Sequence, residues 1–149
     1  MKNRGFSMIE LIVVIAIIAL LAGLLAPALV KYINKARLST DIDTGKEIAK
    51  ALMTNITNEA VRDNAVVHAT PHPVSDMDGN DFKNAVYEML GVSDINGKSS
   101  RDVDGNDFDS DKQRFYYTLD ADKNKVEVYY GGITADYQIY PITGNKLVK

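Results

Sequence analysis

A run of twenty consecutive uncharged residues, from Leu11 to Val30, constrains this 149-residue chain more than any other feature. At about 1.5 Å of rise per residue, a helix of this length crosses the ~30 Å hydrocarbon core of a bilayer. Counted back to Phe6, the apolar stretch contains a single charged residue, Glu10. The segment therefore needs lipid or other apolar helices around it.

The residues that flank this segment predict its orientation and restrict its interpretation. Lys2 and Arg4 precede it, so the short N-terminus is expected on the cytoplasmic side and the rest of the chain outside. A secretory signal has a shorter apolar core, of ~7 to 15 residues, before a small-residue cleavage site. Ala26-Pro27-Ala28 imitates such a site, but the run is too long and Pro27 lies inside it. A plain single-pass anchor fits the length but gives no reason for Glu10, because a carboxylate in the bilayer needs a partner.

The octapeptide Arg4-Gly5-Phe6-Ser7-Met8-Ile9-Glu10-Leu11, followed by the aliphatic run, resembles the class III signal of type IV prepilins and pseudopilins. The resemblance is strongest over residues 4–37. It implies that a prepilin peptidase, which is also a methylase, cuts between Gly5 and Phe6 and methylates the new amino group of Phe6. Residues 1–5 would then be a leader peptide, residues 6–30 a transmembrane and assembly helix, and residues 31–149 a globular pilin head.

Glu10 and Pro27 are the assembly residues that this resemblance implies. Cleavage creates an ammonium group on Phe6, and the carboxylate of Glu10 can pair with the ammonium group of a neighbouring subunit. A buried charge without its partner costs ~3 to 5 kcal/mol, so Glu10 can select correctly staggered subunits. Pro27 falls where pilins often carry a helix-bending proline, and a proline removes one helical hydrogen bond.

Beyond Pro27 the helical pattern continues in amphipathic form, with apolar residues spaced by three and four. These residues are Ile33, Ala36, Leu38, Ile42, Gly45, Ile48, Ala49, Leu52, Met53, Ile56 and Ala60. Charged residues, Asp41 among them, are expected mostly on the opposite face. The sequence thus predicts one helix from about Ser7 to about Arg62, whose second half covers the head.

The segment that follows predicts a loop and a short helix. Pro71 and Pro73 indicate a loop over residues 68–73, and they argue against a metal site at His68 and His72, because they prevent helical i, i+4 geometry. Residues 82–90 read as a helix capped by Asn80 or Asp81, with Phe82, Val86, Met89 and Leu90 inward and Gly91 as its end.

The C-terminal third alternates with a period of two, which predicts β-strands. Residues 115–119 and 126–130 form a predicted hairpin, a third strand ends at Pro141, and residues 146–148 add a short edge. We therefore expect an α+β protein, in which an antiparallel sheet of three or four strands packs on the long helix, as in the pilin fold. Tyrosines on the outer face either bind a surface or a neighbouring subunit, or serve cross-strand packing; they are Tyr116, Tyr129 and Tyr140.

An Asp-rich segment in the head has two interpretations. The pentapeptide Asp-Gly-Asn-Asp-Phe occurs at residues 78–82 and again at 104–108. Around the second copy, oxygen ligands are dense enough to suggest calcium, which takes six to eight of them. The candidate ligands are Asp102, Asp104, Asn106, Asp107, Asp109 and Asp111. The segment misses the EF-hand pattern, and Asp, Asn and Gly are also the usual residues of solvated turns.

Charge and composition exclude several classes of function. Residues 1–37 carry a net charge of +4 and the remainder −7, from five basic and one acidic residue against twelve and nineteen. The acidic head is unsuited to nucleic-acid phosphates. With no cysteine there are no disulfides and no thiol chemistry. No recognisable catalytic set is present, so we do not expect an enzyme, and beyond the possible calcium we expect no cofactor.

The resemblance to prepilins therefore implies a structural subunit of a type IV pilus-like extracellular filament, a homopolymer of identical or related pilin subunits joined through the N-terminal helix. Its expected partners are the prepilin peptidase and a pilus assembly platform. The chain would lie in the cytoplasmic membrane as a single-pass protein with its head outward, and after assembly in a filament at the cell surface. The alternatives are a pseudopilin of a type II secretion or DNA-uptake system and, with less support, a monomeric membrane-anchored binding protein.

Overall fold

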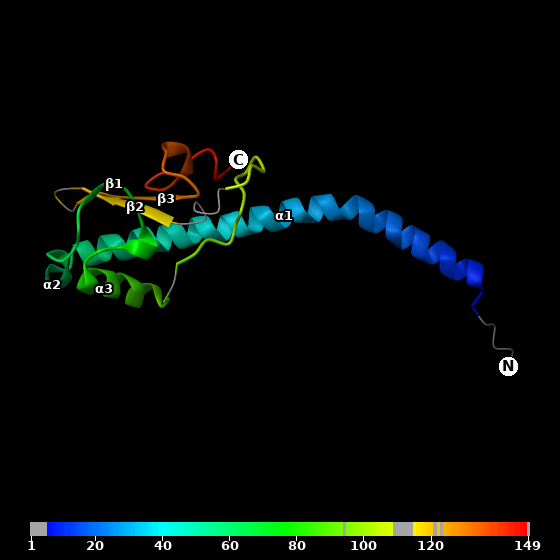
Figure 1. Ribbon diagram of the computed structural model, residues 1–149, viewed down its shortest axis with the longest axis horizontal. Coiled ribbons are helices and arrows are strands. Elements are labelled where there is room, and N and C mark those ends of the chain that lie inside the picture. Colours follow the sequence, from blue (N-terminus) through cyan, green and yellow to red (C-terminus); the bar gives the residue numbers. More distant parts are fainter. Residues whose placement is uncertain (1–5, 94, 109–114, 121, 123, 149) are drawn as a thin grey trace. The chain divides into compact units, whose positions relative to one another are not determined.

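The computed structural model describes residues 6–93, 95–108, 115–120, 122 and 124–148 (Figure 1). The chain divides into two compact units, Met1–Ile33 and Asn34–Lys149. Predictions that fall on Gly5, Asp109 and Asp111 lie outside the described residues.

Helix α1 spans Met8–Ile56, 49 residues. Its N-terminal part is apolar on all sides, and residues 6–33 are exposed throughout. An eighteen-residue window of this helix has a mean hydropathy of 3.0 and no buried residue, which makes α1 the one described helix long and apolar enough to cross a membrane. The helix continues through Gly23 and Pro27 without interruption.

The second unit contains the hydrophobic core, to which α1 contributes from Leu38 onward. Its buried residues are spaced by three and four, as expected for a helix that covers a sheet; they include Leu38, Ile42, Gly45, Ile48, Leu52 and Ile56. Asp41, which was predicted on the polar face, is buried as well, with 1% exposure. Figure 1 shows the strands running alongside this part of α1.

The predicted single helix up to Arg62 is wrong in its last turn. Helix α1 ends at Ile56, and a short helix, α2, spans Glu59–Arg62. The break follows from polar side chains that bond to the nearby backbone and compete with the helix. Thr57 Oγ1 donates to the Thr54 carbonyl at 2.7 Å, and Asn58 caps α2 by accepting from the Ala60 amide at 3.1 Å.

A four-stranded antiparallel sheet has the order β1-β2-β3-β4, which confirms the α+β prediction. Its strands are β1 at His68–Pro73, β2 at Phe115–Leu119, β3 at Val126–Tyr130 and β4 at Gln138–Tyr140. The predicted hairpin is confirmed in full register from Phe115↔Tyr130 to Leu119↔Val126. Alternate residues of β2 and β3 are buried in the core; they are Phe115, Tyr117, Leu119, Val126, Val128 and Tyr130.

Two predictions about the sheet are wrong. Residues 68–73 form strand β1 rather than a loop, because a strand at the edge of a sheet tolerates proline. Residues 145–147 form a turn in which the Leu147 amide donates to the Gly144 carbonyl at 3.1 Å, so residues 146–148 are not an edge strand. Tyr129, which pairs with Tyr116, is on the outer face as predicted but is only 8% exposed, because its hydroxyl donates to Glu127 on the same face at 2.7 Å.

Helix α3 spans Asn80–Leu90, so it begins before the predicted Phe82, and its N-cap is Gly79 in the left-handed region (φ +81°). Its end at Gly91 is confirmed, and this glycine has φ +66°. Phe82 and Val86 are buried as predicted, whereas Met89 is 46% exposed.

Candidate functional site

The described residues of the N-terminal motif, from Phe6 onward, lead into the first turn of α1. Phe6 is 77% exposed, and the Ser7 amide donates to Glu10 Oε2 at 2.8 Å. Ser7 precedes the first helical residue and Glu10 is the third, which is the spacing at which a glutamate reaches back to the amide of the capping residue. A carboxylate here is also stabilised by the positive end of the helix dipole. Sequence reasoning missed this capping role, although the Ser-x-x-Glu spacing signals it.

Pro27, the other predicted assembly residue, lies inside α1, within the exposed apolar segment of residues 6–33. Large aliphatic side chains of this segment have no covering group in the isolated chain. Ile17 is 54% exposed and Leu24 is 70% exposed. This surface therefore requires lipid or other helices, as its sequence predicts.

The Asp-rich segment closes on itself around Asp102, which is 1% exposed. Its Oδ1 accepts from the amides of Asp104 and Asn106, both at 2.9 Å, and its Oδ2 accepts from Asn106 Nδ2 at 3.1 Å. Lys146 Nζ lies 2.9 Å from Asp104 Oδ2 and 3.9 Å from Asp102 Oδ2. These contacts describe a charged turn that is held by hydrogen bonds among its own residues and by the ion pair with Lys146.

Asp107, a further predicted calcium ligand, pairs with Arg101, whose Nε lies 2.6 Å from its Oδ1. The carboxylates of Asp102, Asp104 and Asp107 are thus engaged with cations or amides in this conformation, and Asn106 donates to Asp102. Asp109 and Asp111 lie outside the described residues. Calcium at this segment stays a prediction.

Asp41 attaches the loop before this segment to helix α1. Its two carboxylate oxygens accept from the amides of Lys98 and Ser99, at 2.8 and 2.6 Å. Burial raises the pKa of Asp41, and the two amide hydrogen bonds oppose that rise. Beside it, the Tyr130 hydroxyl donates to the Ser99 carbonyl at 2.6 Å. The loop is therefore bonded to both layers of the head.

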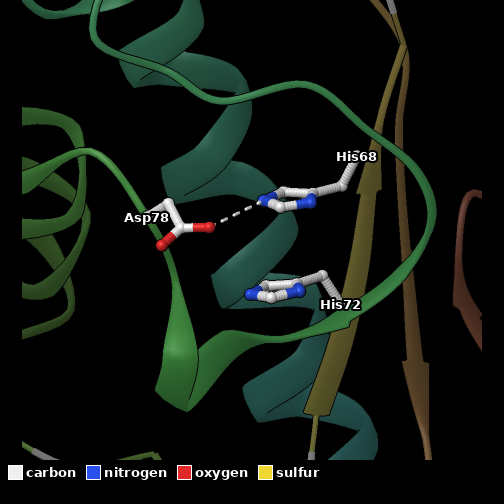
Figure 2. A group of neighbouring side chains, drawn as sticks. All are labelled: His68, His72 and Asp78. Atoms are coloured by element: carbon white, nitrogen blue, oxygen red, sulfur yellow. Dashed lines mark ion pairs between the residues drawn. The ribbon is translucent and has the colours of Figure 1, made fainter.

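Two histidines and an aspartate converge at β1 and the loop before α3 (Figure 2). One ligand atom from each of His68, His72 and Asp78 lies within 4.8 Å of the other two, and this is the one such group in the described part of the chain. The two imidazole rings are stacked, with centroids 4.0 Å apart and planes 4° from parallel. Burial lowers the pKa of His68, as does the neighbouring His72, whereas Asp78 raises it.

This convergence was not predicted from the sequence, because only a helical arrangement of the two histidines was considered. Along a regular strand, side chains four residues apart are on one face but about 13 Å apart. In β1, however, His68 lies opposite Leu119 and His72 opposite Tyr117. An advance of four residues along β1 therefore corresponds to an advance of only two along β2. Such an irregularity bends a strand and redirects its side chains. The sequence signal for this irregular strand was the pair of prolines, one between the two histidines and one after them.

Known proteins resemble this chain at both local and full-length scales. Residues 1–26 match the family described as the prokaryotic N-terminal methylation motif. The chain is 33% identical, over 98% of its length and 78% of the relative's, to a type IV major fimbrial protein FimA of Dichelobacter nodosus. It is 32% identical to another protein of that organism named fimbrial protein, over 98% and 79% of the two lengths. No solved structure shows a significant match.

Proposed function

Because the chain belongs to the type IV pilin family, we propose that it is a structural subunit of a type IV pilus-like filament at the cell surface. The observation that carries this proposal is the exposed apolar part of α1, most of which lies within the residues that match the methylation motif. A subunit with such a helix can be stored in a membrane and later buried against copies of itself. The names of both relatives, a major fimbrial protein and a fimbrial protein, favour a pilus over a secretion pseudopilus and name no enzyme.

Processing is the first step of the proposed function. A prepilin peptidase cuts between Gly5 and Phe6 and then methylates the amino group of Phe6. The position of the cut is chemically reasonable, since Phe6 is exposed and lies just before the first turn of α1. The leader of residues 1–5 is removed and the apolar helix is retained.

Assembly is the second step, and Glu10 is its key residue. In the single subunit the Glu10 carboxylate is occupied by the amide of Ser7. After processing, the ammonium group of a neighbouring subunit's Phe6 is a stronger, charge-assisted partner for the same carboxylate. A subunit in the wrong register leaves both charges unpaired among apolar side chains, which is costly. Glu10 thus favours one stagger of subunits along the filament.

The proposed location follows from these steps. The apolar part of α1 holds the unassembled subunit in the cytoplasmic membrane with its head outward, as the basic N-terminus requires. An assembly platform in that membrane transfers the subunit to the base of the filament, where other helices replace lipid around residues 6–33.

Intact mass and N-terminal sequencing of protein sheared from the cell surface test this proposal. We expect a chain that begins at N-methylated Phe6, in a high-molecular-weight fraction. Relative abundance in that fraction distinguishes a main pilus subunit from a pseudopilin, which forms only a short structure. A chain that begins at Met1 and is found only in membranes would reject the proposal and return the apolar segment to a plain anchor.

A further inference from the structure

We propose that His68, His72 and Asp78 form a binding site for a transition-metal ion, with zinc as the expected metal. Two imidazoles and a carboxylate are a donor set that zinc accepts, with water completing a tetrahedron. The three residues come from two segments of the head, the edge strand β1 and the loop that leads into α3 (Figure 2). An ion here would therefore join these two segments.

The first support is a nitrogen atom without a partner. His68 Nε2 is the one fully enclosed side-chain polar atom among the described residues that makes no hydrogen bond. It lies 3.7 Å from Asp78 Oδ2, too far for a hydrogen bond. Enclosed polar groups are nearly always satisfied, and an exception calls for an explanation such as an ion. A metal between this nitrogen and the carboxylate satisfies both.

The second observation is the hydrogen bond of His72, which sets the change that binding requires. Its Nε2 lies 2.9 Å from the carbonyl oxygen of Asp76. A carbonyl oxygen can only accept, so Nε2 carries a proton in this conformation. Figure 2 shows Nε2, rather than Nδ1, on the side of the ring that faces His68 Nε2 and Asp78. Metal binding through Nε2 therefore moves the proton to Nδ1 and replaces the contact with Asp76.

The distances require a small closure on binding. Ligands of a tetrahedral zinc lie about 3.3 Å apart, given bonds of ~2.0 to 2.1 Å. The 3.7 Å between His68 and Asp78 is near that value, and no ligand separation exceeds 4.8 Å. Asp78 can move easily, because its side chain is 61% exposed and lies in a loop. The two parallel rings must tilt so that their lone pairs meet at one point.

The donor set also distinguishes this site from the Asp-rich segment around Asp102. Calcium prefers a shell of six to eight oxygens, whereas imidazole suits zinc, copper and nickel. Copper(II) is expected to bind more tightly than zinc at the same ligands. Zinc binding that calcium does not displace therefore reports on the histidine site.

The test uses the full chain in detergent, purified without a histidine tag and stripped with a chelator. Calorimetric titration with zinc is expected to give one ion per chain and an increased melting temperature, because binding to the folded state stabilises it. Asp78→Asn and His72→Gln are each expected to weaken zinc binding about tenfold or more. Asp76→Asn is the matched control: it removes a neighbouring charge but no ligand, and its side chain still accepts from Ser75.

The outcomes separate the site from less specific binding. Absence of saturable zinc binding overturns the proposal, as does unchanged affinity in either ligand variant. An equal loss of zinc affinity in Asp76→Asn would show that local charge alone attracts the ion, and this result also overturns the proposal. Displacement of zinc by millimolar calcium places the ion elsewhere in the head. The circular dichroism of each variant checks that the fold is retained.

Discussion

Gly45 of α1 lies against Ile139 of β4 so closely that a Cβ atom built on the glycine would be 3.0 Å from Ile139 Cγ2 and nearer still to Cδ1. The helix reaches the sheet at this point only because the residue has no side chain. We expect Gly45→Val to destabilise the head by ~1 to 3 kcal/mol, since extra carbons in a packed core force neighbours apart. Chemical denaturation of the full chain in detergent, followed by the near-ultraviolet signal of the tyrosines, measures this change.

A paired substitution is the control for that contact. Ile139→Val removes Cδ1, the atom nearest to the added carbon, so Gly45→Ala should cost less in this background than in the wild-type chain. Equal costs in the two backgrounds would show that Ile139 does not restrict residue 45.

Asp41 predicts a pH dependence of stability. Burial raises its folded-state pKa above the ordinary value of 3.8, so the folded state holds this proton more tightly than the unfolded state. The contribution of Asp41 to stability is therefore fully present below about pH 4 and is lost as the pH rises through the folded-state pKa. The free energy of unfolding, measured from pH 4 to 7, should contain a falling component that Asp41→Asn removes.

Asp41→Asn should also destabilise the chain at every pH, by ~1 to 3 kcal/mol. Its two oxygens accept from two amides, and the asparagine places an NH2 group against one of them. Asp43→Asn is the control, because the Asp43 side chain is 71% exposed on the same helix. A similar loss in both variants would mean that the net charge of the helix, and not the Asp41 contacts, is responsible.

The sequence predicted those parts of the structure that follow from short-range periodicity. Two patterns determine the long helix: the apolar run, and the spacing of apolar residues by three and four from Leu38 onward. The alternation in residues 115–130 determines the hairpin in the same way. Burial of Asp41 did not follow, because it depends on amides of residues 98 and 99, far along the chain. The histidine cluster depends likewise on the irregular pairing of β1 with β2, which no local pattern contains.

Asp102 is expected to contribute more to stability than the ion pair beside it. Asp102→Ala removes the buried carboxylate that accepts from the amides of Asp104 and Asn106, and the loss of these two hydrogen bonds costs ~1 to 3 kcal/mol. Lys146→Met removes the cation of an ion pair at the surface, where screening by solvent leaves such a pair little effect on stability. Thermal unfolding of both variants measures the difference, and a larger loss from Lys146→Met would contradict this ranking.

Glu10 has two separable roles, the cap of α1 and the proposed contact with a neighbouring subunit. Glu10→Gln retains an oxygen that accepts from the Ser7 amide but has no charge, whereas Glu10→Ala loses both. If the charge is the assembly device, both variants should be cleaved and inserted in the membrane, yet give at least about tenfold less sheared filament. An unpaired buried ammonium group, at ~3 to 5 kcal/mol, is sufficient for that loss.

The comparison between the two variants decides which role matters. Filament yield is measured in the sheared fraction by quantitative immunoblot, and the membrane fraction is sequenced to confirm that the chain begins at Phe6. Normal yield from Glu10→Gln with a loss in Glu10→Ala would assign the effect to helix capping and reject the pairing of charges. Glu10→Asp tests the reach of the carboxylate, because it keeps the charge but shortens the side chain by one carbon, and we expect an intermediate yield.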